Sequence, residues 1–144
     1  MKRWTFGYRI PLYNSYVPVR ANIKRVSNAR LYNKGLDRLD GIEVPYTPKH
    51  CLHVYHQYTI RVLGGRRDAL REHLKAKGIG TGVYYPKGLY DSPVLKGRLK
   101  QTKKDFPETE KTCKEVLSLP VHPLLSKADI ARVIKSIREF IARS

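Results

Sequence analysis

The chain has 144 residues, of which 41% are hydrophobic, and this fits one globular domain with a core of its own. It contains no apolar run long enough to span a bilayer and no apolar stretch typical of a signal peptide, so we expect a protein of the reducing cytoplasm with Cys51 and Cys113 as free thiols. The 29 Lys and Arg against 12 Asp and Glu give a net charge of +17, which predicts an anionic partner: nucleic acid, a phosphate-bearing metabolite or an acidic protein surface.

Residues 1–17 are expected to form an irregular N-terminal segment, and residues 18–144 the folded domain. The first segment mixes aromatic, basic and proline residues without a helical or strand period. Such a composition is compatible with a nucleic-acid-binding arm, in which rings stack on bases and cations meet phosphates. It is equally compatible with a segment packed on the domain, or with one that lacks its natural partner.

The domain is predicted to begin with a helix from Pro18 to Leu39, because proline suits a first helical turn and apolar residues follow at near-helical spacing. An interruption near Ser27 and Asn28 is compatible with the pattern, and Asp40–Gly41 is expected to end the helix. Residues 42–44 can form a short strand. Residues 53–62 alternate between apolar and polar side chains, which is typical of a half-buried strand.

A cluster of possible metal ligands, His50, Cys51, His53 and His56, lies at the start of this alternating stretch. On a strand His53 and His56 point to opposite faces, so they cannot close one site together without a bend. No carboxylate or second cysteine pair nearby completes a tetrahedral set. We therefore assign no metal site.

A helix over residues 66–77 follows the Gly64–Gly65 turn, with Ala69, Leu70 and Leu74 facing inward. Gly78 is expected to terminate it. The next segment, Gly78-Ile79-Gly80-Thr81-Gly82-Val83-Tyr84-Tyr85-Pro86, predicts a tight turn, a short strand and an abrupt exit at Pro86. It places two phenol groups at the end of a strand, where they can face a ligand, although tyrosine is also a common strand residue.

The second half begins with a long polar loop over residues 87–104, whose densest basic patch comprises Lys96, Arg98, Lys100, Lys103 and Lys104. Asp105, Pro107 and Glu108 resemble a helix start, with Asp105 as N-cap and the helix running to about Val116. A short strand over residues 117–119 precedes a helix that begins after Ser126 and ends near Ala142. The elements predict an α+β fold, with a small mixed sheet of three or four strands packed against three or four helices.

Several segments resemble the C-terminal small domain of the DegT/DnrJ/StrS family of pyridoxal-phosphate-dependent aminotransferases, which act on nucleotide-linked keto-sugars. The stretches over residues 54–62 and 67–74 are similar to that domain. The segment 78–86 looks like the family pattern GIGTGVxYP, and residues 106–123 are similar to its closing pattern "FP…AEK…EVLSLP.HP". The resemblance covers residues 30–142 in unbroken order and implies the fold of the C-terminal domain of fold-type I pyridoxal-phosphate transferases, together with a role in nucleotide-sugar and polysaccharide biosynthesis.

The resemblance also implies that this chain lacks the large N-terminal domain, which carries the Schiff-base lysine, the carboxylate that pairs with the pyridine nitrogen and most phosphate contacts. We therefore expect a truncated domain that is not catalytic alone, with no catalytic or cofactor-binding residue of its own and no pyridoxal phosphate bound. Gly7-Tyr8-Arg9 resembles the family's "GYN" at the inter-domain junction, with arginine in place of the asparagine.

For the substrate, the resemblance implies contacts from Tyr84 and Tyr85, where family members commonly have His-Tyr-Pro and this chain has Tyr84-Tyr85-Pro86. The expected partners are a nucleotide-sugar substrate, if a large domain complements the chain, and either a second copy or a separate large-domain chain. No membrane partner is expected. The alternative interpretation, based on the charge of +17, is a basic nucleic-acid-binding module.

Overall fold

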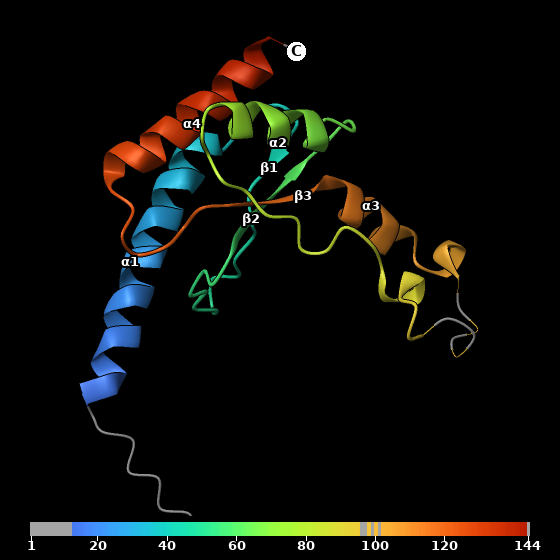
Figure 1. The fold of residues 1–144 in the computed structure, drawn as a ribbon. Coiled ribbons are helices and arrows are strands. Elements are labelled where there is room, and N and C mark those ends of the chain that lie inside the picture. Colours follow the sequence, from blue (N-terminus) through green and yellow to red (C-terminus); the bar gives the residue numbers. More distant parts are fainter. Residues whose placement is uncertain (1–12, 96–97, 99, 101, 144) are drawn as a thin grey trace, which may run out of the picture.

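The computed structural model describes residues 13–95, 98, 100 and 102–143. Four α-helices, three β-strands and two short 3-10 helices follow one another in this part of the chain (Figure 1). In chain order they are α1 (Tyr13–Leu36), β1 (Ile42–Glu43), β2 (Tyr58–Val62), α2 (Arg67–Ala76), η1 (Leu89–Asp91), η2 (Lys103–Asp105), α3 (Pro107–Glu115), β3 (Val116–Leu119) and α4 (Lys127–Ala142).

The three strands form one antiparallel sheet in the order β1-β2-β3. Central strand β2 pairs Val62 with Ile42 of β1, and Tyr58 with Leu119 of β3. Every residue of β3 is buried, while β2 alternates between buried and half-buried positions. The sheet is covered by α1, α2 and α4, and Figure 1 shows α3 with the long loop before it on the other side of the strands from α1 and α4.

The predicted α+β class, three strands and four helices are confirmed, but the expectation of a mixed sheet is wrong. The strand expected after α2 is reduced to a single antiparallel bridge between Gly82 and Ser118. Because β3 already uses its opposite edge to pair with β2, the glycine-rich segment lies along its free edge. The segment then leaves after one bridge, before the proline that could not donate to the ladder.

Helix α1 begins five residues earlier than predicted, at Tyr13, and ends at Leu36. Pro18 therefore lies inside the helix and not in its first turn, a position that proline disfavours because it has no N–H for the hydrogen bond to the preceding turn. The helix continues through Ser27 and Asn28 without an interruption. Arg38 adopts a left-handed conformation with φ 60°, and this reversal ends the helix before the predicted residues. The expected irregular arm lies outside the described residues over positions 1–12.

Strand β2 is shorter than predicted, because the five residues before Tyr58 are not paired in the sheet. Its partner β3 ends at Leu119, opposite Tyr58, and Pro120 then has no N–H to continue the ladder. The backbone N–H of Tyr55 instead donates to Nδ1 of His53 at 2.9 Å, and Tyr55 has φ 50°. A local bond of this kind replaces the sheet hydrogen bonds.

The predictions of helices α2, α3 and α4 are confirmed with two corrections. Leu70 and Leu74 are buried in the core, but Ala69 is exposed. Asp105 does not cap α3: its carboxylate accepts a 2.6 Å hydrogen bond from the N–H of Thr102 and so closes η2, while Phe106 is the N-cap of α3. Ser126 caps α4 as predicted, accepting a 3.1 Å hydrogen bond from the N–H of Asp129.

Within the described residues no helix combines the length and the apolarity needed to cross a membrane. Cys51 is exposed, Cys113 is half-buried, and they form no disulfide. The core is continuous from α1 through the sheet to α2 and α4, and its fully buried large side chains include Tyr32, Tyr58 and Leu117.

Candidate functional site

The end of α2 fixes where the glycine-rich segment starts. The N–H of Gly78 donates to the carbonyl oxygen of Lys75, and the N–H of Ile79 donates to that of Leu74, both at 2.9 Å. Gly78 has φ 70°, and this left-handed conformation with paired hydrogen bonds is the Schellman motif. Ile79 is buried beside Leu74. The chain therefore leaves α2 in a fixed direction, which leads toward the edge of β3.

Gly82 attaches the segment to the sheet. Its N–H donates to the carbonyl oxygen of Ser118 at 3.0 Å, and its own carbonyl accepts from the N–H of Ser118 at 2.7 Å. The ring of Tyr84 folds back over this bridge, because a Cβ atom at Gly82 would lie 2.5 Å from the Cε2 atom of Tyr84. Glycine at this position is therefore required by the placement of the Tyr84 ring.

Tyr84 closes one side of a hollow of about 460 Å³. The hollow is shared by four segments that are far apart in sequence, and Tyr84, His56, His122 and Arg25 each line it. The remaining lining residues are Gln57, Gly80, Thr81, Gly82, Ser118, Leu119, Pro120 and Val121. Hydrogen-bond donors dominate the side chains of this lining and it contains no carboxylate, so the hollow is suited to a ligand with anionic oxygen atoms.

Helix α1 holds the floor of the hollow through buried polar groups. The amide nitrogen Nδ2 of Asn28 donates to the carbonyl oxygen of His122 at 3.1 Å, and the hydroxyl of Tyr32 donates to the carbonyl oxygen of Pro120 at 2.8 Å. These bonds satisfy carbonyl groups of a segment that has left the sheet. Burial raises the pKa of the Tyr32 phenol well above its ordinary value, so this hydroxyl remains a donor at neutral pH.

Tyr58 supports Tyr32 from the sheet. Its ring stacks on that of Tyr32 with centroids 4.8 Å apart, and its hydroxyl donates to Oδ1 of Asn33 at 2.6 Å. Burial also raises the pKa of Tyr58, with smaller contributions from Tyr55 and Tyr32. The two phenols therefore connect α1, β2 and the segment after β3. This connection places His122, at the end of that segment, in the lining of the Tyr84 hollow.

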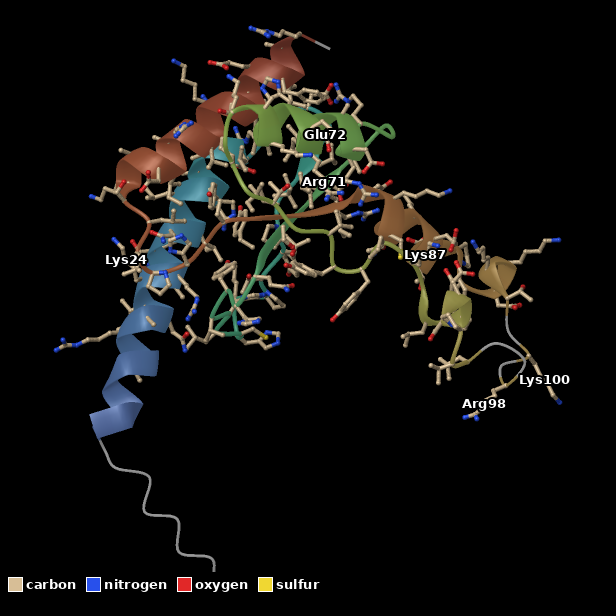
Figure 2. The ribbon with its side chains drawn as sticks, viewed as in Figure 1. Lys24, Arg71, Glu72, Lys87, Arg98 and Lys100 are labelled. Carbon is tan, nitrogen blue, oxygen red and sulfur yellow. The ribbon has the colours of Figure 1, made fainter. Side chains whose placement is uncertain are left out.

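Tyr85 lies on a different surface from Tyr84. Their rings meet edge to face with centroids 6.2 Å apart, and the peptide bond between them is cis. Tyr85 lines a second hollow of about 380 Å³ together with Lys87 and residues of α3; Figure 2 shows Lys87 between the loop and α3. The structure therefore does not bring the two predicted substrate contacts into one hollow, and ligand contact by either tyrosine stays a prediction.

Sequence reasoning missed Arg25, His56 and His122 as lining residues of the Tyr84 hollow. His56 was considered only as a metal ligand, and His122 only as part of a family pattern. A signal for His122 was present, since the polar Asn28 and the amphipathic Tyr32 lie on the buried stripe of a helix, where such groups need hydrogen-bond partners. Arg25 carried no sequence signal that separates it from the other basic residues of α1.

The histidine- and cysteine-containing segment does not gather ligands in the structure. Among the described residues no group of three or more His, Cys, Asp or Glu side chains is placed to hold a metal ion. Nδ1 of His53 already accepts the N–H of Tyr55. His56 lines the Tyr84 hollow instead.

The basic patch of the long loop is only partly described, since Lys96 lies outside the described residues. Figure 2 shows Arg98 and Lys100 pointing away from the domain. The ammonium group of Lys103 lies 3.0 Å from Asp91, and this hydrogen bond raises the pKa of Lys103. The contact between Lys103 and Asp91 therefore joins two parts of the long loop and has a structural role.

Pyridoxal phosphate needs a lysine amine for its Schiff base. No lysine belongs to the described lining of the Tyr84 hollow. Arginine and histidine side chains there suit phosphate oxygens, but the amine and a partner for the pyridine nitrogen are missing from the described lining. The residues present therefore do not fit the cofactor by themselves.

The fold and the hollow define a small α+β domain of the kind found in pyridoxal-phosphate transferases, with its glycine-rich segment and the segment after β3 at one edge of the sheet. The DegT/DnrJ/EryC1/StrS aminotransferase family matches residues 19–138. The chain belongs to this family.

Curated relatives match most of this chain but only part of themselves. A dTDP-3-amino-3,4,6-trideoxy-alpha-D-glucose transaminase of Streptomyces venezuelae is 38% identical over 122 residues, which cover 85% of this chain and 31% of the relative. A pleiotropic regulatory protein of Geobacillus stearothermophilus is 40% identical over 120 residues, which cover 81% of this chain and 31% of that protein. The chain thus spans about a third of the length of these relatives.

Solved structures agree on the fold. S. venezuelae DesV, in complex with a ketimine intermediate, superimposes with a TM-score of 0.81 at 37% identity, covering 86% of this chain and 33% of DesV. DesI, in the presence of its TDP-sugar product, superimposes with a TM-score of 0.77 at 26% identity, covering 87% of this chain and 32% of DesI. The PLP-form of the sugar aminotransferase Spr1654 from Streptococcus pneumoniae gives 0.75 at 20% identity, with 85% and 32% covered, and shows the fold alone.

Proposed function

We propose that this chain is the C-terminal, substrate-facing domain of a pyridoxal-phosphate-dependent aminotransferase acting on a nucleotide-linked keto-sugar. One observation carries the proposal: Tyr84, on the segment that resembles the family's glycine-rich pattern, closes a hollow with Arg25, His56 and His122. A nucleotide sugar brings two phosphates and several hydroxyl groups, and this lining offers a guanidinium, two imidazoles and a phenol. The relatives that are named for dTDP-sugars support this class of substrate.

In this proposal the residues of the chain bind and orient the nucleotide sugar. The reacting groups come from the part of the family fold that the chain does not span. Pyridoxal phosphate, if bound to that part, would supply the carrier for the amino group and the electron sink for the reaction. Arg25 neutralises a phosphate of the nucleotide, while the phenol of Tyr84 donates to a phosphate or sugar oxygen. Tyr85, on its separate surface, contacts a more distant part of the substrate.

The test of substrate binding is a titration with dTDP, followed by nuclear magnetic resonance of the isotope-labelled chain. We expect the largest shifts at His56, Tyr84 and His122. Replacing Arg25 by glutamine removes a charge-assisted hydrogen bond and should weaken dTDP binding about tenfold. The matched control is Arg71→Gln, because Arg71 lies on α2 outside the lining of the hollow (Figure 2). Equal weakening by both variants, or shifts confined to other surfaces, would contradict the proposal.

Catalysis has a separate test. We expect the purified chain, incubated with pyridoxal phosphate and reduced with borohydride, to yield no adduct at a single specific lysine, because no lysine lines the described hollow. The measurement is peptide mass spectrometry of the reduced product. A unique pyridoxyl-lysine together with turnover of a dTDP-linked keto-sugar would show that the chain is catalytic alone.

Nucleic-acid binding is the second candidate, and the observation that favours it is the net charge of +17. If it holds, the affinity for a DNA or RNA oligonucleotide falls steeply and linearly with the logarithm of salt concentration, with a slope that counts the phosphate contacts. A gel-shift series at increasing salt measures this slope. Absence of binding at low salt excludes the candidate.

A further inference from the structure

An exposed apolar face joins α1 to the loop before β2. Val19, Ile23, Val26, Leu52 and Val54 line a hollow of about 590 Å³ there, and we call these five residues the apolar face. Leu52 is 87% exposed, Ile23 65% and Val19 55%. Figure 1 shows this first half of α1 extending beyond the sheet and the other helices. Exposed aliphatic clusters of this kind mark interaction surfaces.

The apolar face borders the core that the same helix helps to build, since the half-buried Val26 packs against that core. Ala29, Tyr32 and Leu36, one to two turns further along α1, are completely buried against the rest of the domain. The helix therefore has apolar residues that are covered in its second half, while Val19 and Ile23 in its first half are exposed. Val19 and Ile23 do not contribute to the core of the domain, and their exposure indicates a surface for a partner.

Arg30 is the charged residue that lines the hollow of the apolar face, together with the polar Asn22 and Ser27, whereas Arg25 lines the Tyr84 hollow. Helix α1 carries five basic residues and no Asp or Glu, and residues 44–57 of the loop likewise contain Lys49 and three histidines but no Asp or Glu. The five basic residues of α1 are Arg20, Lys24, Arg25, Arg30 and Lys34. Figure 2 shows Lys24 on this helix. The complementary surface is therefore apolar at its centre and acidic at its rim.

The charge distinguishes between the possible occupants. A second copy would bring the same basic rim and the same net charge of +17 to the interface, so like charges would oppose each other. A nucleic acid would meet the charges, but its phosphates and sugars offer nothing to fill an aliphatic hollow, and its bases stack on aromatic rings, of which the apolar face has none. A polypeptide can supply both an apolar side chain for the hollow and carboxylates for the rim.

We propose that the apolar face binds an acidic-rimmed apolar segment of polypeptide, equivalent to a part of the relatives that this chain does not span. The chain covers only about a third of those relatives, and the apolar face lines an exposed hollow that a further polypeptide can cover. The inference rests on the proposed function, but it involves a different surface from the Tyr84 hollow.

The test is site-specific photo-crosslinking of the full chain in the organism that encodes it. Benzoylphenylalanine replaces Ile23 on the apolar face, and a control chain carries it at Leu89, which is 77% exposed and lies on the long loop. After irradiation, mass spectrometry identifies the crosslinked peptides. We expect position 23 to crosslink at least about tenfold more than position 89, as expected of a buried interface centre, to an Asp- and Glu-rich segment of a polypeptide with a borohydride-reducible pyridoxyl-lysine.

Charge reversal tests the rim. The pair Arg20→Glu and Arg30→Glu should lower the yield at position 23 by about fivefold or more, because rim charges set the association rate. The control pair is Lys111→Glu and Lys114→Glu on α3, which makes the same change of charge away from the apolar face. Crosslinks to a second copy, to nucleic acid or to a protein without the cofactor lysine, or equal yields at positions 23 and 89, would overturn the inference. The dTDP titration does not depend on this surface, so the two proposals fail separately.

Discussion

The side-chain amide of Asn28 donates a 3.1 Å hydrogen bond to the backbone carbonyl oxygen of His122, across 94 residues of sequence. Asn28 is 1% exposed, so this contact joins the middle of α1 to the segment that follows the last strand. Together with the bond from Tyr32 to Pro120, it determines where that segment passes and therefore which side chains line the Tyr84 hollow.

Replacing Asn28 by alanine should lower the free energy of unfolding by about 1 kcal/mol, because it removes one hydrogen bond to the carbonyl oxygen of His122, which keeps its 3.2 Å hydrogen bond from the N–H of Leu125. Chemical denaturation measures this change. Asn22→Ala is the control, since the Asn22 amide contacts only the half-buried Arg25 on the same helix at 3.1 Å. If the two variants lose equal stability, the hydrogen bond from Asn28 to His122 does not make the expected contribution to the free energy of unfolding.

The buried phenols predict a loss of stability at high pH. Burial raises the pKa of Tyr32 and of Tyr58 in the folded protein, so the unfolded chain releases these protons first. The contribution is complete below the unfolded pKa of about 10 and is lost as pH rises above it toward the folded pKa. The slope approaches about 1.4 kcal/mol per pH unit for each phenol.

The measurement for this prediction is urea denaturation between pH 8 and 11, with Tyr58→Phe as the variant. This variant lacks one titrating phenol and the bond to Asn33, so it should be less stable at pH 8 but should lose less stability on going to pH 11. Tyr46→Phe is the matched control, because Tyr46 is 85% exposed. Identical alkaline slopes for all three proteins would show that the buried phenols do not control the transition.

The start of α4 depends on a capping box. The Ser126 hydroxyl accepts from the N–H of Asp129, and the Asp129 carboxylate accepts from the N–H of Ser126 at 2.8 Å. Ser126→Ala should cost about 1 kcal/mol of stability. The Ser126 hydroxyl also donates to the Asp129 carboxylate at 2.6 Å. This hydrogen bond, followed by the one from the Ser126 N–H, lowers the pKa of Asp129 below its ordinary value, so its contribution is present above that value and is lost as pH falls through the lowered pKa.

Acid titration of stability checks the capping prediction. Asp129→Asn should remove this acid-dependent part and leave the profile flatter below about pH 4. Asp40→Asn serves as the control, since Asp40 is an exposed acid outside the cap of α4. A larger change of the acid profile in the control would show that α4 capping is not the source.

Gly82 and Gly80 provide a matched pair for the placement of Tyr84. A Cβ atom at Gly82 would lie within 2.8 Å of three atoms of the Tyr84 ring, while one at Gly80 meets no atom within 4 Å. Gly82→Ala should therefore displace the ring and weaken dTDP binding severalfold, with a stability loss below about 1.5 kcal/mol. Gly80→Ala should change neither.

Calorimetric titration with dTDP and thermal unfolding measure both effects of the glycine variants. Unaltered dTDP affinity in Gly82→Ala, with Tyr84 shown to have moved by its NMR shifts, would separate this ring from substrate binding. Equal effects of the two variants would instead show that the whole glycine-rich segment responds to any added methyl group.

The sequence by itself determined the α+β class, the position of α4 and the family. These follow from local signals that the tertiary structure did not override: the apolar stripe Ile130, Val133 and Ile137 with its Ser126 cap, and a glycine-rich pattern after a helix. Helix periodicity and caps act over a few residues and can be read directly.

The tertiary structure decided which residues share a hollow and where the strands end. Strand β2 stops at Tyr58 because its partner β3 is limited by Pro120, which no pattern around residue 58 reveals. Tyr84 and Tyr85 are adjacent in sequence but line different hollows, while Arg25, His56 and His122 meet beside Tyr84 only through the packing of α1 on the segment after β3. Contacts between distant segments depend on how the core packs, and local sequence patterns do not encode that packing.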